Sequence, residues 1–308
     1  MTGLRIVFAG SPSAAIPSLR AIASSRHDVA TVVTREKSPL GRKRILTATP
    51  VARVARELSL PVLETNRLAG EAAHSLMAAE PDLGVIVAYG GLVREPLLAS
   101  PRYGWINLHF SLLPRWRGAA PVQRAIMAGD DVTGATVFQL VSELDAGPVF
   151  GMATQAIGRN ETAGHLLDSL ADTGAGLLVS VIDMIADGSA RAVEQSGDVT
   201  LAPKLILEDG RVDWAGTASV VHRRIRGVTP EPGAFTTVDG ARLKILDALI
   251  AHDAAPKAPG RIESDGGRVL VGTATEPIEL LTVQPAGKRA MAASDWWRGR
   301  QGAEVMAT

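Results

Sequence analysis

Apolar strands alternate with helices through the first 190 or so residues, and this alternation limits the possible folds more than any other feature. Residues 4–10 predict a buried strand ending in a glycine turn, and the helix that follows is expected at 17–24. Further strands are expected at 28–34, 82–89, 104–110 and 134–141, and further helices at 50–58, 70–79, 121–127 and 164–186. The pattern predicts an α/β domain with a doubly wound, mostly parallel, Rossmann-like sheet.

The pattern changes near residue 187, where turn residues become frequent. One helix is expected at 217–226, followed by short strands spaced about every 10–15 residues. These strands are expected at 235–238, 242–249, 260–262, 268–272 and 278–283. The sequence therefore predicts an N-terminal domain over residues 1–188, a linker over 189–206, and a small C-terminal, OB-like β-barrel over 207–308.

Composition narrows the class of protein. Lys and Arg together number 32, and so do Asp and Glu, so a polyanion would have to be met by local patches rather than by overall charge. The chain has no cysteine, which excludes disulfides and thiolate chemistry. No apolar run has the length of a membrane span, the first residues lack a signal-peptide pattern, and the six histidines are too scattered to form a metal site. We therefore expect a cytoplasmic enzyme without a metal or membrane association.

Two polar side chains interrupt the apolar strand at 104–110. Asn107 and His109 are two residues apart, so they project from the same face of the strand. If the strand that precedes Asp145 lies beside this one, the carboxyl ends of the two strands bring amide, imidazole and carboxylate together. This trio suits acyl transfer to an amine, with Asn107 and a protonated His109 as oxyanion donors and Asp145 or His109 as acid or base. The alternative is a structural histidine in a local polar network.

Three further segments each leave two interpretations open. The turn at Gly10 resembles a dinucleotide-binding turn, but its glycine spacing favours a plain strand-to-helix turn. Tyr89 to Leu92 end a strand with two glycines, which either admit a ligand to the backbone or form a turn. Residues 34–45 hold five basic side chains against one acidic, and form either a solvated loop or a phosphate contact.

Several runs closely resemble the methionyl-tRNA formyltransferase family. The most specific is His109-Phe-Ser-Leu-Leu-Pro-Arg-Trp-Arg-Gly-Ala-Ala-Pro-Val-Gln-Arg-Ala-Ile126. The resemblance extends over about residues 4–300. The other matching runs are Arg5-Ile-Val-Phe-Ala-Gly-Ser-Pro12, Gly41-Arg-Lys-Arg44, Ala88-Tyr-Gly90, Leu144-Asp-Ala-Gly147, Ala202-Pro-Lys-Leu205 and Gly233-Ala-Phe235.

The resemblance implies transfer of the formyl group of 10-formyltetrahydrofolate to the α-amine of methionyl-initiator tRNA. It implies that Asn107 and His109 hold and polarise the formyl oxygen, and that Asp145 completes the catalytic trio. It assigns a folate-lining role to Ser111, Leu112, Leu113 and Pro114, and backbone contacts with the pterin to Tyr89, Gly90, Gly91 and Leu92. It also implies that the basic residues Arg42, Lys43 and Arg44 meet the tRNA acceptor arm, and that the C-terminal barrel covers more of the RNA. We expect a monomer.

The chain departs from the family pattern at three places. The loop Gly41-Arg-Lys-Arg-Ile-Leu46 lacks a second glycine, Phe110 replaces a small residue, and Gly91 stands where a bulkier residue is common. Three rival functions are a formyltransferase for a sugar-nucleotide amine, a formyl-group hydrolase, and a nucleic-acid-binding protein without catalysis. The basic loop argues against the first, and the intact trio argues against the last.

Overall fold

The computed structural model describes residues 3–41, 44–300 and 305–308. By their internal contacts the residues form two compact units that alternate along the chain. Unit 1 holds residues 1–121, 132–156 and 167–202, and unit 2 holds residues 122–131, 157–166 and 203–308. The division into domains at 188 and 207 stays a prediction, since neither unit is one continuous stretch.

Unit 1 is built on a seven-stranded sheet in the order β10-β9-β7-β6-β1-β2-β5. Every pairing from β7 to β5 is parallel, whereas β9 runs antiparallel to both of its neighbours. The predicted doubly wound, mostly parallel, Rossmann-like sheet is confirmed. Its strands are β1 (Arg5–Gly10), β2 (Asp28–Thr34), β5 (Val62–Glu64), β6 (Leu83–Val87), β7 (Trp105–His109), β9 (Val132–Gln139) and β10 (Val149–Ala156).

Helices cover the sheet, and α2 (Pro50–Glu57) begins at a local sequence signal. Thr49 caps the N-terminus of α2 by accepting a hydrogen bond from the Ala52 N–H at 3.0 Å, and Pro50 takes the first helical position. The other helical segments of unit 1 are η1 (Ser13–Ala15), α1 (Ile16–Ala23), α3 (Glu71–Ala78) and most of α5 (Ala163–Ala186).

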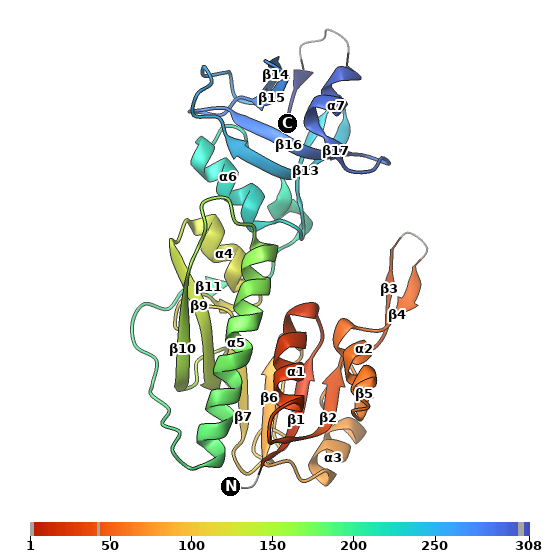
Figure 1. Cartoon of the computed structure of the whole chain (residues 1–308), viewed down its shortest axis with the longest axis vertical. Coiled ribbons are helices and arrows are strands. Elements are labelled where there is room, and N and C mark those ends of the chain that lie inside the picture. Colours follow the sequence, from red (N-terminus) through yellow and green to blue (C-terminus); the bar gives the residue numbers. More distant parts are fainter. Residues whose placement is uncertain (1–2, 42–43, 301–304) are drawn as a thin grey trace. The chain divides into compact units, whose positions relative to one another are not determined.

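The long helix α5 lies along the sheet beside β9 and β10 (Figure 1). Gly174 lets it approach closely, because an added Cβ would stand 3.0 Å from the Leu108 side chain on β7. Within the described residues, α5 is also the one helix whose length and apolar composition would suffice to cross a membrane. Its contacts with β7, β9 and β10 are those of a helix that covers a sheet face.

Some elements escaped the sequence prediction. The strand β10 was missed, and its exposure alternates along an edge of the sheet instead of forming an apolar run. The basic segment contains a short hairpin of β3 (Ser38–Leu40) and β4 (Ile45–Thr47). The expected linker lies against unit 1 up to residue 202, since β11 (Leu201–Ala202) pairs with β8 (Arg117–Gly118).

Unit 2 is an antiparallel barrel, as predicted, and the end of the chain closes it. The strand order is β12-β13-β16-β15-β14-β18, with β17 beside β16. After β18, Ala307 bridges Val238 on β12, and Thr308 exchanges two backbone hydrogen bonds with Thr237. The strands are β12 (Ala234–Val238), β13 (Ala241–Ile250), β14 (Arg261–Asp265), β15 (Arg268–Val271), β16 (Ile278–Pro285), β17 (Met291–Ala292) and β18 (Val305–Met306).

Among the described residues of unit 2, four helical segments accompany the barrel. The end of α4 packs closely on the end of α6, because a Cβ at Gly227 would stand 2.6 Å from the Met127 side chain. The buried face of α6 carries Val221 and Ile225 into the apolar core of the barrel. The segments are α4 (Pro121–Ala128), η2 (Leu207–Gly210), α6 (Ala218–Gly227) and α7 (Ala293–Arg298).

His222 lies on the buried side of α6 and is only 5% exposed. Its Nε2 donates a hydrogen bond to the Ala248 carbonyl at 3.1 Å. Burial and, to a lesser degree, the nearby charge of Arg226 lower the pKa of His222 to about 4. The neutral imidazole is therefore the form that the folded barrel accommodates.

This burial predicts a loss of stability in mild acid. Below pH 6.5 the unfolded chain protonates His222 while the folded chain does not, so the free energy of unfolding falls by up to about 3 kcal/mol as the pH drops toward 4. His222→Gln keeps an N–H donor but cannot titrate. Its urea-unfolding midpoint should therefore change less between pH 7.5 and 5 than that of the wild type. An equal change in both proteins would contradict this account, and His74→Gln, at an exposed site on α3, is the matched control.

Candidate active site

Asn107 and His109 lie in the C-terminal half of β7, a central strand of the unit 1 sheet. Both point to the same face, and the apolar Ile106 and Leu108 point to the other. Asn107 is half-buried, and no hydrogen bond of its amide is found within the described part of the chain. Its amide N–H groups are consequently available to a ligand.

His109 is buried, and one of its ring nitrogens is already engaged. Nε2 lies 2.8 Å from the carbonyl oxygen of Trp116, which can only accept, so Nε2 carries the hydrogen. The Phe138 ring meets the imidazole edge to face, with 6.5 Å between the centroids. Nδ1 is therefore the nitrogen that can exchange a proton with a reactant.

Burial sets the resting protonation of His109. It lowers the pKa of His109, and this effect outweighs the charge of Asp145 and the Trp116 carbonyl, which both raise it. The charge of Asp145 thus favours the imidazolium, but the net lowering of the pKa makes the neutral ring, rather than the protonated His109 considered as an oxyanion donor, the resting form. The resting ring is neutral, with a free electron pair on Nδ1.

The loop after β9 brings Asp145 close to His109 in a way that the sequence did not indicate. We expected the carboxyl ends of the two strands to coincide, but β9 runs antiparallel to β7 and ends beside the start of β7. The connection 140–148 folds back instead. It brings Asp145 Oδ2 to 3.8 Å from His109 Nδ1 and 2.8 Å from the backbone N–H of Gly118, which donates to it.

The segment after His109 wraps around the imidazole. Ser111 is fully buried, and its hydroxyl donates to the Arg115 carbonyl at 2.6 Å, so it shapes the turn. Of the four residues predicted to line a folate site, Ser111, Leu113 and Pro114 are buried and Leu112 is half-buried.

Sequence reasoning missed three polar residues that hold this segment. Thr136 on β9 stands opposite His109 and donates to the Ser111 carbonyl at 2.6 Å. Thr200 accepts a hydrogen bond from the Trp116 N–H at 2.9 Å, and Gln195 binds the Asp145 loop. Gln195 and Thr200 lie in the predicted linker, where no local sequence pattern indicates a role for them.

A second turn, Tyr89 to Leu92, follows β6. Arg35 holds it by donating to the Tyr89 carbonyl and to the Gly90 carbonyl, and its guanidinium lies 5.7 Å from the Tyr89 ring centre. The Tyr89 hydroxyl donates to the Thr65 carbonyl at 2.8 Å, and its ring is buried. Arg35 thus helps to hold this turn in place.

The basic hairpin is only partly described. Arg42 and Lys43 lie outside the described residues. Arg44 is exposed and has a left-handed backbone with a φ of 49°. Ile45 and Leu46 beside it are 62% and 66% exposed, so the described part of the hairpin presents aliphatic as well as basic side chains.

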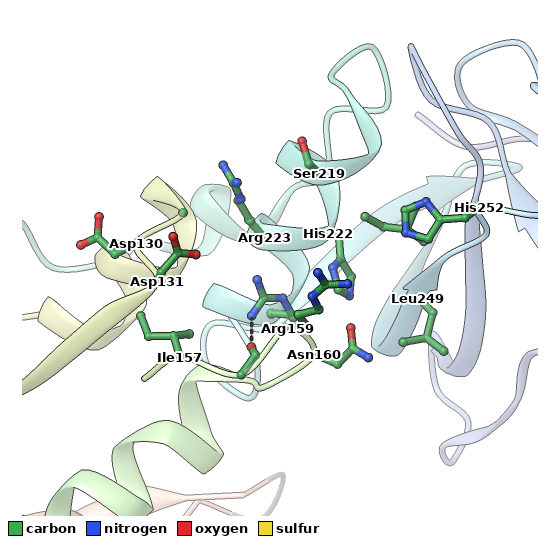
Figure 2. A pocket seen from close by; sticks show the side chains of 14 residues that line it. Asp130, Asp131, Ile157, Arg159, Asn160, Ser219, His222, Arg223, Leu249 and His252 are labelled. Atoms are coloured by element: carbon green, nitrogen blue, oxygen red, sulfur yellow. Dashed lines mark hydrogen bonds between the residues drawn. The ribbon is translucent and has the colours of Figure 1, made fainter. Parts of the chain in front are cut away.

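A separate cavity of about 560 Å³ lies within unit 2. Figure 2 shows its acidic residues Asp130 and Asp131 on one side and His222 and His252 on the other. Three arginines also line it, so the lining is mixed in charge: Arg159, Arg223 and Arg226. None of the predicted site residues lines this cavity. In the described part of the chain, no group of three or more acidic or histidine side chains is placed to hold a metal ion.

Comparisons with known proteins agree on the family. The family described as "Formyl transferase" matches residues 4–182, and "Formyl transferase, C-terminal domain" matches residues 204–301. A methionyl-tRNA formyltransferase of Clavibacter sepedonicus is 60% identical over 99% of this chain and 100% of its own length. One from Leifsonia xyli subsp. xyli (strain CTCB07) is 57% identical over 98% of this chain and 100% of its own length.

A solved structure supports the fold. WlaRD, a sugar 3N-formyl transferase crystallised with dTDP and 5-N-formyl-THF, superimposes with a TM-score of 0.68 and 16% identity. The match covers 94% of this chain and 100% of that one. At this identity the likeness concerns the fold alone.

The Tyr89 turn predicts a cost for a side chain at Gly91. A Cβ at that position would stand 2.4 Å from Cε1 of the Tyr89 ring, which is held in place by its hydroxyl. Gly91→Ala should therefore lower the free energy of unfolding by about 1–3 kcal/mol, measured by urea denaturation. Gly176→Ala, in α5 where nothing lies within 4 Å, is the control and should cost nothing. Equal stability of the two variants would refute the steric account.

Proposed function

The chain belongs to the methionyl-tRNA formyltransferase family and is thus a formyl-transferring enzyme, and we propose that Asn107, His109 and Asp145 carry out the transfer. The reaction moves the formyl group of 10-formyltetrahydrofolate to the α-amine of methionyl-initiator tRNA. The observation that carries the residue assignment is the 3.8 Å approach of Asp145 Oδ2 to the one ring nitrogen of His109 that is not hydrogen-bonded to the backbone.

The neutral imidazole suits an amine nucleophile. As the amine nitrogen bonds to the formyl carbon, His109 Nδ1 accepts the proton that the nitrogen must lose. The resulting imidazolium carries a hydrogen on Nδ1 that faces Asp145, whose negative charge stabilises it. Asn107 donates an amide N–H to the oxyanion. When the bond between the formyl carbon and N10 breaks, the same imidazolium returns the proton to N10.

We assign the folate contacts to the two segments that come after the carboxyl ends of β6 and β7. We assign the pterin to the backbone of Tyr89, Gly90, Gly91 and Leu92. Since Ser111, Leu113 and Pro114 are buried, their part is to shape the wall of the folate site, and the half-buried Leu112 offers the contact surface. No metal is required by this chemistry.

The tRNA contacts are assigned to the basic hairpin and the barrel. Arg42, Lys43 and Arg44 would meet the phosphates of the acceptor arm. We assign the enzyme to the cytoplasm, a compartment in which charged initiator tRNA is used, and expect it to act there as a monomer.

One assay separates the rival functions. The purified protein is incubated with 10-formyltetrahydrofolate and either methionyl-initiator tRNA or a sugar-nucleotide amine, with formate release measured in parallel. Formyl transfer to the tRNA alone is expected, because relatives of that specificity are 57–60% identical over nearly the whole chain. Transfer to the sugar amine, or release of formate without an acceptor, would favour a rival.

The proposed roles predict a loss of turnover rather than of binding. Asn107→Ala removes an oxyanion donor and should lower kcat about 10²–10³-fold. His109→Ala removes the proton carrier and should lower kcat about 10²–10⁴-fold. Single-turnover rates and tRNA affinities, measured separately, check both. The assignment fails if either variant keeps a near-normal kcat.

The hairpin assignment predicts a change in salt dependence. Arg42→Ala combined with Lys43→Ala should weaken tRNA binding and reduce the slope of log Kd against log salt by about 1–2, because two phosphate contacts are lost. Filter binding over a range of salt concentrations measures the slope. Arg20→Ala, which removes an exposed arginine paired with Glu57, should leave the slope as it is. An unchanged slope in the double variant would rule out phosphate contacts by these residues.

A further inference from the structure

Gln195 is a half-buried residue in an exposed stretch of unit 1. The residues on both sides of it, 191–194 and 196–199, are all exposed. Its carboxamide nevertheless makes four hydrogen bonds. Oε1 accepts from Arg117 Nε at 3.2 Å and from Arg117 Nη2 at 2.6 Å. Nε2 donates to the Asp145 carbonyl at 2.8 Å and to the Gly147 carbonyl at 2.9 Å.

These bonds fix both partners of the contact that orients the Asp145 carboxylate. Asp145 Oδ2 accepts from the Gly118 N–H at 2.8 Å, and Gly118 directly follows Arg117. The Gln195 amide therefore holds two residues at once. One is Asp145, and the other is Arg117, whose neighbour Gly118 donates to the Asp145 carboxylate. A shift of either would change the distance between Asp145 and His109 Nδ1.

The backbone at Asp145 requires such support. Its φ of 46° lies in the left-handed region, which costs a residue with a Cβ on the order of 1–2 kcal/mol. Leu144, the preceding residue, is 58% exposed. Gln195 supplies two of the hydrogen bonds that hold this turn, beside the one between the Gly118 N–H and the Asp145 carboxylate.

Only a neutral amide of this length satisfies all four partners. Two carbonyls need donors and the guanidinium needs an acceptor. Glutamate has no hydrogen to donate to the carbonyls, lysine cannot accept from Arg117, and leucine can do neither. Asparagine keeps the amide but is shorter by one methylene.

We propose that Gln195 is a positioning residue for formyl transfer, which holds the Asp145 loop and the Arg117–Gly118 strand so that the Asp145 carboxylate faces His109. The inference rests on the proposed roles of His109 and Asp145. It means that the exposed stretch around Gln195, which carries none of the proposed catalytic groups, affects the rate of formyl transfer.

The first test is Gln195→Leu, which removes the hydrogen bonds without adding charge. We expect kcat to fall about 10–100-fold, as for a misplaced catalytic group, with KM for both substrates within about twofold. Because Asp145 raises the pKa of His109, its displacement should move the acid limb of the pH–kcat profile to lower pH. Gln195→Asn should give a smaller change in the same direction. Gln155→Leu, which breaks a glutamine contact with Ser169 elsewhere in unit 1, should change neither.

A double-mutant cycle distinguishes positioning from general destabilisation. Gln195→Leu should have little further effect on kcat in an Asp145→Asn background, because the group that it positions has already lost its charge. Effects of the two substitutions that multiply, or a wild-type pH profile in Gln195→Leu, would overturn the proposal.

An NMR titration of His109 tests the positioning role of Gln195 independently of formyl transfer. In ¹⁵N-histidine-labelled protein, the pKa of His109 should fall in Gln195→Leu and fall further in Asp145→Asn. If the wild type transfers no formyl group to methionyl-tRNA, the proposed function fails, yet this titration still reports whether Gln195 positions Asp145. An unchanged His109 pKa in Gln195→Leu would overturn the positioning role.

Discussion

The hydrogen bond from His109 Nε2 to the Trp116 carbonyl determines what the site can do. Because a carbonyl can only accept, the bond fixes the hydrogen on Nε2 and leaves the electron pair on Nδ1. Burial then keeps the ring neutral, and the carboxylate of Asp145 lies beside Nδ1, the nitrogen that must take up a proton. One backbone contact thus selects the tautomer, the reactive atom and the direction from which a reactant must approach.

That contact depends on residues far apart in the sequence. The Trp116 carbonyl is aimed at His109 by a left-handed backbone at Trp116, whose N–H is held by Thr200. Thr136 on the neighbouring strand ties down the Ser111 carbonyl in the same segment. The final stretch of unit 1, residues 189–202, therefore belongs to the architecture of the site although it carries none of the proposed catalytic groups.

The sequence predicted what depends on local periodicity. Period-two alternation placed Asn107 and His109 on one face of β7, and the alternation of strands and helices predicted the sheet around them. Features that depend on how distant segments pair in the fold could not be predicted from the sequence. The antiparallel direction of β9 depends on how it docks against β7, so the route of Asp145 was misjudged. The contacts of Gln195 depend on residues 50 and 78 positions away, and no local rule could indicate them.

Part of the backbone strain lies where the site is built. Of the seven non-glycine residues with positive φ in the described part of the chain, Ala88, Trp116 and Asp145 lie at the turns after β6, β7 and β9. Each such conformation costs on the order of 1–2 kcal/mol and persists only where surrounding contacts hold it. At Trp116 and Asp145 these contacts come from Thr200 and Gln195, which lie in one exposed segment. Because that segment fixes both the Trp116 backbone, whose carbonyl binds Nε2, and the loop that faces Nδ1, it orients the imidazole from both sides.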